Sequence, residues 1–251
     1  MNEVTVVAHR GMAAGCPENT IAALRHSVSL GFPVIEIDLR PTADGHIVIM
    51  HDDTVDRTTD GTGEVARMTL AEIRSLDAGR HAGLRFAGER VPTYAEALHV
   101  PGTTLILDVK SGDTEQIVRL TERHGAIRNV IAASRSGTDL RDFARIPGLR
   151  TLGLVPGPES DPPDPAVLDE FARTGAEFIR LWPRWIMAAP ELVERLHRLG
   201  KQVWATADTG YGDISPEHPD DDLSELVRLG VDGIVTDLPD VLRDVLAAGT
   251  S

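Results

Sequence analysis

The sequence contains a single cysteine, Cys16, and aromatic residues make up only 4% of its 251 positions. One cysteine excludes an intrachain disulfide and the multi-cysteine cluster of a structural zinc site, which fits a reducing compartment. No apolar run approaches the roughly 18 residues of a membrane span, and the N-terminal residues lack the apolar segment of a signal peptide. We therefore expect a cytoplasmic protein with no stable membrane association.

Basic charge is also scarce. Lys and Arg total 25 against 39 Asp and Glu, which gives a formal net charge of -14, and no basic cluster occurs. Nucleic-acid-binding proteins usually carry a basic face, so no nucleic-acid partner is expected. An acidic chain can nevertheless hold an anion through a bound dication with local cations beside it.

Short β-branched runs alternate with amphipathic stretches along the chain. The runs are apolar at almost every position, as is typical of strands covered on both faces; they occupy 4–8, 34–38, 104–109, 129–133, 151–155, 177–181, 202–205 and 233–236. Helical patterns lie between them at 20–30, 113–124, 165–174, 190–199 and 222–229. This alternation predicts an α/β protein, a (β/α)8 TIM barrel forming a single domain over residues 1–251. A doubly wound open sheet is the alternative, although it would normally use fewer strands.

A ninth apolar run, at 46–50, interrupts the alternation. It follows Asp38 too closely for a crossover helix, and the turn sequence TADG at 42–45 separates the two. We therefore expect run 46–50 to be the return arm of a hairpin that begins with the second strand. Residues 53–98 then form a long excursion with a helical pattern at 69–76, which we interpret as a small inserted subdomain at the barrel mouth.

Ionisable side chains gather at the predicted strand ends, where active sites of this architecture lie. In chain order they are His9, Arg10, Glu36, Asp38, His51, Asp52, Asp108 and Lys110. Glu36 and Asp38 are two residues apart, so both side chains point the same way on a regular strand, and Asp108 and Lys110 repeat this spacing. Burying carboxylates without partners costs several kcal/mol each, so these acids must pair with cations, hold a metal, or both.

Carboxylates meeting at one barrel mouth offer the oxygen ligands that Mg²⁺ and Ca²⁺ prefer. Such a cation, with Arg and Lys beside it, neutralises a phosphate group and the charge that develops on it. Two histidines can then take a proton from the attacking oxygen and give one to the leaving alkoxide. The residue set therefore indicates metal-dependent phosphoryl chemistry. Structural ion pairs, Glu36 with Arg10 and Asp108 with Lys110, are the alternative interpretation.

An ordered series of motifs resembles the glycerophosphodiester phosphodiesterase family. The series consists of HRG at 9–11, PENT at 17–20, EID at 36–38, HD at 51–52, RTTDGTG at 57–63, VPTYAEAL at 91–98, LDVK at 107–110, Trp204 and GIVTD at 233–237. The resemblance spans nearly the whole chain. The sequence departs from the family at Asp108, where glutamate is usual, at Ser134-Arg135, and at residues 205–207.

The resemblance implies that the protein hydrolyses a glycerophosphodiester, a small molecule, to an alcohol and sn-glycerol 3-phosphate with one divalent ion, Mg²⁺ or Ca²⁺. The implied acid–base pair is His9 and His51. The implied metal ligands are Glu36, Asp38 and Asp108. The implied substrate contacts are Arg10 and Lys110 at the phosphate and Trp204 beside the alcohol or glycerol, and the implied supporting residues are Glu18 and Asn19.

Two other functions are compatible with the same residues. A lysophospholipase D-like enzyme would use apolar residues of the inserted segment, such as Leu84 and Phe86, to dock on lipid. A non-catalytic barrel would retain the site as a relic, and the Asp108 departure is the best support for it. The loop at Trp182–Trp185 either contacts substrate or packs under the next helix, and Arg135 either meets a second negative charge or is an exposed loop residue. The sequence sets no oligomeric state.

Overall fold

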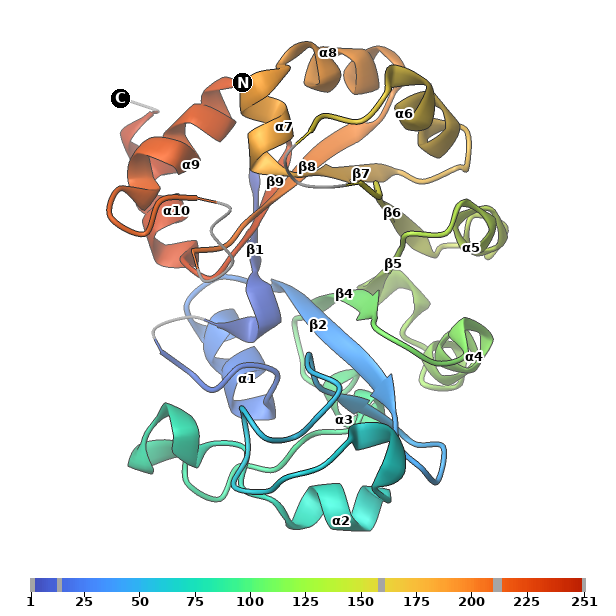
Figure 1. Cartoon of the computed structure of the whole chain (residues 1–251), viewed down its shortest axis with the longest axis vertical. Coiled ribbons are helices and arrows are strands. Elements are labelled where there is room, and N and C mark those ends of the chain that lie inside the picture. Colours follow the sequence, from blue (N-terminus) through green and yellow to red (C-terminus); the bar gives the residue numbers. More distant parts are fainter. Residues whose placement is uncertain (1–2, 13–14, 158–160, 210–213, 250–251) are drawn as a thin grey trace. The chain divides into compact units, whose positions relative to one another are not determined.

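The structure is a computed structural model that describes residues 3–12, 15–157, 161–209 and 214–249 (Figure 1). Strands and helices alternate along the chain as expected, and the fold is the predicted (β/α)8 barrel with one additional strand. The chain divides into two compact units, Ala8–Val130 and Met1–Val7 with Ile131–Ser251, which are described separately. In the described part of the chain, no helix is long and apolar enough to cross a membrane.

The strands of the unit Ala8–Val130 are β2 (Val34–Pro41), β3 (Ile47–Ile49) and β4 (Thr104–Val109), in the sheet order β4-β2-β3. β2 and β4 run parallel, and their register sets Asp38 beside Asp108. β3 runs antiparallel to β2, with Leu39 opposite Ile49. The predicted hairpin is therefore confirmed.

The two faces of β2 differ in chemistry. Ile35, Ile37 and Leu39 are completely buried and belong to one face, because side chains alternate along a strand. Glu36 and Asp38 consequently share the opposite face, and both are buried as well. The apolar face fixes the register of the strand, since a slip by one residue would exchange the faces.

The helices of this unit are α1 (Ile21–Ser29), α2 (Leu70–Ser75), α3 (Tyr94–Ala97) and α4 (Thr114–Arg123), with short 3-10 turns η1 (His9–Gly11), η2 (Val65–Arg67), η3 (Arg80–Ala82), η4 (Leu84–Phe86) and η5 (Ile127–Asn129). Each α-helix begins after a side chain that accepts a hydrogen bond from its first turn, namely Thr20, Thr69, Thr93 and Asp113. α1, α2 and α4 fall within the ranges expected from the sequence.

The segment 53–98 has a small apolar core that it shares with the β2–β3 hairpin. Val55, Val65, Ile73 and Val91 pack there, together with Val48 of β3. The segment is therefore held against the hairpin arm that leads into His51.

Gly79 allows the close approach of two turns of this segment. A Cβ atom at position 79 would lie 1.9 Å from the carbonyl oxygen of Phe86. Gly79→Ala is therefore expected to lower the free energy of unfolding by about 2 kcal/mol, as is usual for overpacking a filled site. Urea denaturation measures this change, with Gly249→Ala as the control, because the nearest atom to a Cβ there is 3.7 Å away. Equal unfolding midpoints for the two variants would contradict the predicted clash.

The second unit contains β5 (Val130–Ser134), β6 (Arg150–Leu154), β7 (Phe178–Leu181), β8 (Gln202–Ala207) and β9 (Gly233–Thr236), each parallel to the next, and β1 (Thr5–Ala8) begins in it. Its helices are α5 (Gly137–Phe143), α6 (Pro165–Ala172), α7 (Pro183–Ala188), α8 (Glu191–Arg198), α9 (Pro219–Arg228) and α10 (Pro239–Ala248). One apolar cluster joins them, in which Ile179, Val203 and Ile234 are fully buried.

The stretch at Trp182–Trp185 does not form the expected loop, because most of it is the start of α7. Pro183 stands in the first helical turn, a position that suits proline because no backbone donor is needed there. Trp185 is completely buried in the apolar cluster. The guanidinium carbon of Arg180 lies over the ring of Trp182, 3.8 Å from the ring centre. Of the two alternatives for Trp185, packing is the one observed.

Candidate active site

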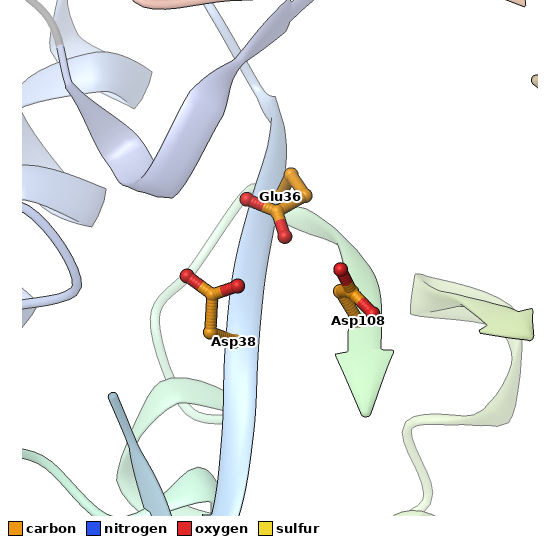
Figure 2. Close-up of side chains that lie close together, drawn as sticks. All are labelled: Glu36, Asp38 and Asp108. Atoms are coloured by element: carbon orange, nitrogen blue, oxygen red, sulfur yellow. The ribbon is translucent and has the colours of Figure 1, made fainter. Parts of the chain in front are cut away.

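Three carboxylates of the unit Ala8–Val130 converge on one point. Oxygen atoms of Glu36, Asp38 and Asp108 all lie within 4.8 Å of one another. Figure 2 shows Glu36 and Asp38 projecting from β2 and Asp108 from β4. Because Asp38 and Asp108 are partners in register, the strand pairing itself brings the three acids together.

The cluster is electrostatically unfavourable for Glu36. Burial, followed by the neighbouring charge of Asp38, raises the pKa of Glu36 from 4.5 to about 8. Burial and the neighbouring carboxylates therefore outweigh the opposing charges of His9 and Lys110 at this carboxyl group. This is the environment that a bound cation would relieve.

Lys110 supplies part of the positive charge. Its Nζ lies 2.6 Å from Asp108 Oδ2 and 2.9 Å from Asp38 Oδ1. Burial alone would lower the pKa of Lys110, but the carboxylates of Asp38 and Asp108 outweigh it and raise the pKa. The lysine is therefore a firmly charged ammonium group at the edge of the cluster.

Two residues of the first loop have a left-handed backbone conformation that residues other than glycine rarely adopt. Within the described ranges, the non-glycine residues with positive φ are Arg10, at 54°, and Asn19, at 57°. The left-handed conformation costs roughly 1–2 kcal/mol for a residue with a Cβ. The amide of Asn19 donates to the carbonyl of Arg10, at 2.8 Å, so the two strained residues support each other.

This conformation directs both side chains at Asp38. Asn19 Nδ2 donates to Asp38 Oδ2 at 2.8 Å, and the amide of Asp38 donates back to Asn19 Oδ1. Arg10 Nε lies 3.4 Å from the same Asp38 oxygen, while its amide donates to Glu36 Oε2. Arg10 Nη1 also donates to Glu18 at 3.0 Å. Of the structural ion pairs considered above, Lys110 with Asp108 is seen, and the guanidinium of Arg10 pairs with Asp38 and Glu18.

The two histidines border the carboxylates. His9 Nε2 lies 3.8 Å from Glu36 Oε2. His51 directs Nδ1 at Asp52 Oδ1, 2.7 Å away, and its carbonyl accepts two hydrogen bonds from Arg40 of β2. Burial, opposed by the hydrogen bond to Asp52, lowers the pKa of His51, and the charge of Asp38 also acts on this ring. The lowered pKa favours the neutral imidazole, the form that can accept a proton.

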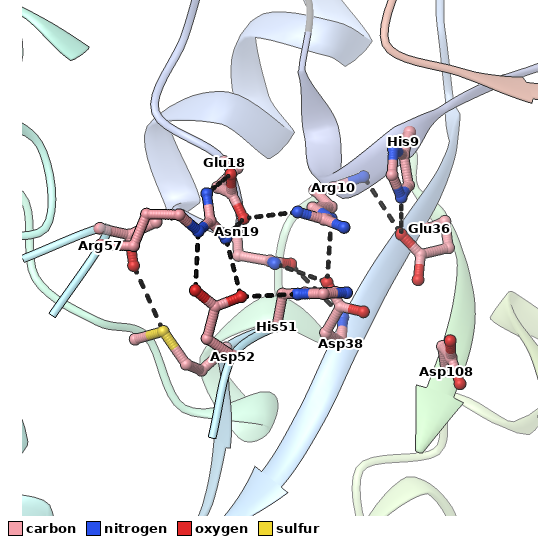
Figure 3. Close-up of polar contacts among 12 residues, drawn as sticks. His9, Arg10, Glu18, Asn19, Glu36, Asp38, His51, Asp52, Arg57 and Asp108 are labelled. Carbon is pink, nitrogen blue, oxygen red and sulfur yellow. Dashed lines mark hydrogen bonds and ion pairs between the residues drawn. The ribbon is translucent and has the colours of Figure 1, made fainter. Parts of the chain in front are cut away.

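Arg57, the first residue of the RTTDGTG motif, has no role expected from the sequence but lies beside the site. Its guanidinium binds both oxygens of Glu18, at 2.6 and 2.9 Å, and both oxygens of Asp52, at 2.7 and 3.1 Å (Figure 3). Sequence reasoning missed this contact because Arg57 and Glu18 are 39 residues apart.

The residues present fit a divalent cation. The described network has five carboxylates, those of Glu18, Glu36, Asp38, Asp52 and Asp108, and three cations, those of Arg10, Arg57 and Lys110. Two negative charges therefore remain when all are ionised. The donors at the cluster are oxygens, which suits Mg²⁺ or Ca²⁺.

Trp204 and Arg135 belong to the second unit. Trp204 of β8 is 2% exposed and its ring centre lies 4.5 Å from that of Phe178. Its indole Nε1 is buried and has no hydrogen-bond partner in the described part of that unit. Arg135 is an exposed residue directly after β5. The substrate-contact role predicted for Trp204 stays a prediction.

Comparison with known proteins identifies relatives along the whole chain. Residues 9–145 match the model of the glycerophosphoryl diester phosphodiesterase family. A glycerophosphodiester phosphodiesterase of Caldanaerobacter subterraneus subsp. tengcongensis is 35% identical, over 97% of this chain and 98% of its own.

Solved structures agree with this assignment. A glycerophosphodiester phosphodiesterase from Agrobacterium tumefaciens is 29% identical with a TM-score of 0.77, covering 96% of this chain and 99% of its own. An Oleispira antarctica phosphodiesterase, solved in complex with the product sn-glycerol 3-phosphate, is 26% identical with a TM-score of 0.81, covering 97% of this chain and 96% of its own.

Proposed function

Because this chain belongs to the glycerophosphoryl diester phosphodiesterase family, we propose that it hydrolyses glycerophosphodiesters to an alcohol and sn-glycerol 3-phosphate. The observation that carries the proposal is the convergence of three carboxylates, two histidines and two cationic side chains within one compact unit. The product held by the Oleispira relative supports the choice of sn-glycerol 3-phosphate.

Glu36, Asp38 and Asp108 would hold one divalent ion, Mg²⁺ or Ca²⁺. When bound, this ion would neutralise charge on the phosphate oxygens. Arg10 and Lys110 would bind the same phosphate, because both are charged and border the carboxylates. Asn19 keeps Asp38 in one orientation through its paired hydrogen bonds, and Glu18 keeps Arg10 in place.

In direct attack by water, His51 would take the proton from the attacking water molecule. The Asp52 carboxylate can only accept a hydrogen bond, so it selects the tautomer with the proton on Nδ1, and Nε2 then carries the lone pair. The new P–O bond forms as this proton moves to Nε2, and the bond from phosphorus to the alcohol oxygen breaks. His9, starting the step as an imidazolium, would protonate the departing alkoxide, and exchange with solvent would then remove the proton from His51 and return one to His9.

The remaining predictions from sequence stand as parts of this proposal. Trp204 would line the binding site beside the alcohol or glycerol group. Residues 53–98 would form a subdomain inserted in a single domain that spans 1–251. Leu84 is 80% exposed in that segment, which is the observation that keeps a lysophospholipase D-like activity as the second candidate.

An assay with matched substrates tests the proposed function. We expect glycerophosphocholine and glycerophosphoethanolamine to release sn-glycerol 3-phosphate with Mg²⁺ or Ca²⁺, and EDTA to abolish the release, because the carboxylate cluster alone cannot neutralise the phosphate. A coupled glycerol 3-phosphate dehydrogenase reaction measures the product. Turnover of micellar lysophosphatidylcholine in place of the soluble diesters would select the second candidate. No product from any diester with any divalent ion would support the non-catalytic barrel.

A further inference from the structure

Arg57 is a charged side chain of the inserted segment that the proposed chemistry does not use. It makes four hydrogen bonds to two carboxylates, with donor–acceptor distances between 2.6 and 3.1 Å. A surface arginine that only forms an exposed salt bridge contributes little to stability, because solvent and salt screen the pair. Two bidentate contacts fix the plane of the guanidinium and the orientation of both acids.

The two carboxylates that Arg57 binds lead to different parts of the site. Asp52 uses one oxygen, Oδ1, to accept hydrogen bonds from both Arg57 and His51 Nδ1. Glu18 likewise uses Oε1 to accept hydrogen bonds from the guanidinium groups of both Arg57 and Arg10. Figure 3 shows Arg57 between Glu18 and Asp52, with Arg10 and His51 on the side toward Asp38. One guanidinium therefore sets the position of an acid–base group relative to a phosphate contact.

Without this arginine, Asp52 and Glu18 would each gain freedom. Asp52 is part-exposed, so it could turn to solvent and release His51 Nδ1. The hydrogen bonds from Arg57, supported by His51, lower the pKa of Asp52 well below its usual range, which keeps it a pure acceptor. Lysine could preserve the charge but not the four directed bonds, because an ammonium group lacks the planar fork.

We propose that Arg57 is a positioning residue for the hydrolysis proposed above. It holds His51 in the tautomer with the proton on Nδ1 and fixes the position of this ring relative to the guanidinium of Arg10. The inference rests on the proposed function for its effect on rate. Its effect on the His51 tautomer is independent of substrate.

Arg57→Gln tests the proposal, with Arg57→Lys as the conservative variant. We expect Arg57→Gln to lower kcat about 10- to 100-fold, as is common when a partner behind a reacting group is lost. Arg57→Lys should recover only part of this loss. Arg74→Gln is the matched control, since Arg74 lies in the same segment and pairs at 2.6 Å with Glu96, whose carboxylate caps α3. Thermal unfolding verifies that all variants are folded.

The ring tautomer is the direct readout. Long-range ¹H–¹⁵N NMR of the imidazole should show the His51 Nδ1–H tautomer in the unmodified protein and a mixture of tautomers in Arg57→Gln. In a His51→Ala background, Arg57→Gln should cause a much smaller loss of kcat than in the unmodified protein, because the part of its effect that passes through the ring is already absent and only the contact through Glu18 to Arg10 remains. An unchanged tautomer in folded Arg57→Gln would overturn the proposal, as would a full additional loss of kcat in the His51→Ala background. A tautomer change in a protein inactive on every diester would uphold it and refute the proposed function instead.

Discussion

His51→Ala is expected to lower kcat on glycerophosphodiesters by about three orders of magnitude, the usual scale for a lost general acid or base. The physical reason is the orientation of the ring, which points Nδ1 at Asp52 and thereby assigns proton acceptance to Nε2. Steady-state kinetics with saturating metal measures the change. His46→Ala is the control, because His46 is an exposed histidine just before β3 whose contact to Asp44 is 4.0 Å long.

A comparison of leaving groups separates the two histidines. The p-nitrophenolate group of a p-nitrophenyl diester leaves without being protonated. This substrate should therefore restore much of the activity of His9→Ala but little of that of His51→Ala. The opposite pattern would exchange the two roles. Near-normal kcat in His51→Ala with every substrate would remove His51 from the mechanism, and the proposed role of Arg57 would fall with it.

Glu36→Gln should abolish metal-dependent activity while stabilising the metal-free protein. Glutamine has no negative charge, so the dissociation constant of Mg²⁺ or Ca²⁺ should rise at least about 100-fold, more than the loss of an outer hydrogen-bond partner costs. The amide oxygen can still accept the hydrogen bond that Arg10 N donates to Glu36. Isothermal titration calorimetry measures the affinity, with Glu64→Gln as a control for an exposed carboxylate paired with Arg67.

The stability change has a defined pH dependence. The pKa of Glu36 is about 8 in the folded protein against 4.5 ordinarily, so the folded state binds this proton more tightly than the unfolded state. The metal-free protein therefore loses stability at this site as the pH rises from about 4.5 to 8. Thermal unfolding in EDTA should show Glu36→Gln melting above the unmodified protein at pH 8, with the difference vanishing near pH 4. A variant that melts lower at pH 8 would show that the buried carboxylate is not destabilising.

The carboxylate cluster was predictable from sequence because strand geometry alone produces it. Glu36 and Asp38 alternate with isoleucines, which specifies their common face, and a parallel neighbour strand carries Asp108 to the same level. His9 and His51 were predictable in the same way, because each directly follows a predicted strand. These inferences needed only local periodicity and the barrel architecture, and the resemblance to the family then implied the role of each residue.

The contacts that sequence reasoning missed depend on how loops approach each other. Arg57 reaches Glu18 only because the segment 53–98 packs on the β2–β3 hairpin through its own apolar core. Nothing in the spacing of these residues indicates that approach. The helix α7 was missed for a different reason, since residues 182–185 directly follow a predicted strand and were expected to form a loop, whereas Pro183 occupies a first helical turn, which proline favours.

The left-handed backbone at Arg10 and Asn19 bears on protein engineering. Glycine adopts this conformation without a Cβ clash, so replacing either residue by glycine would release backbone strain of roughly 1–2 kcal/mol. Each such replacement would delete a side chain that holds Asp38. Because an unpartnered buried carboxylate costs several kcal/mol, more than the strain released, a library screened only for heat resistance should still retain arginine and asparagine at these two positions.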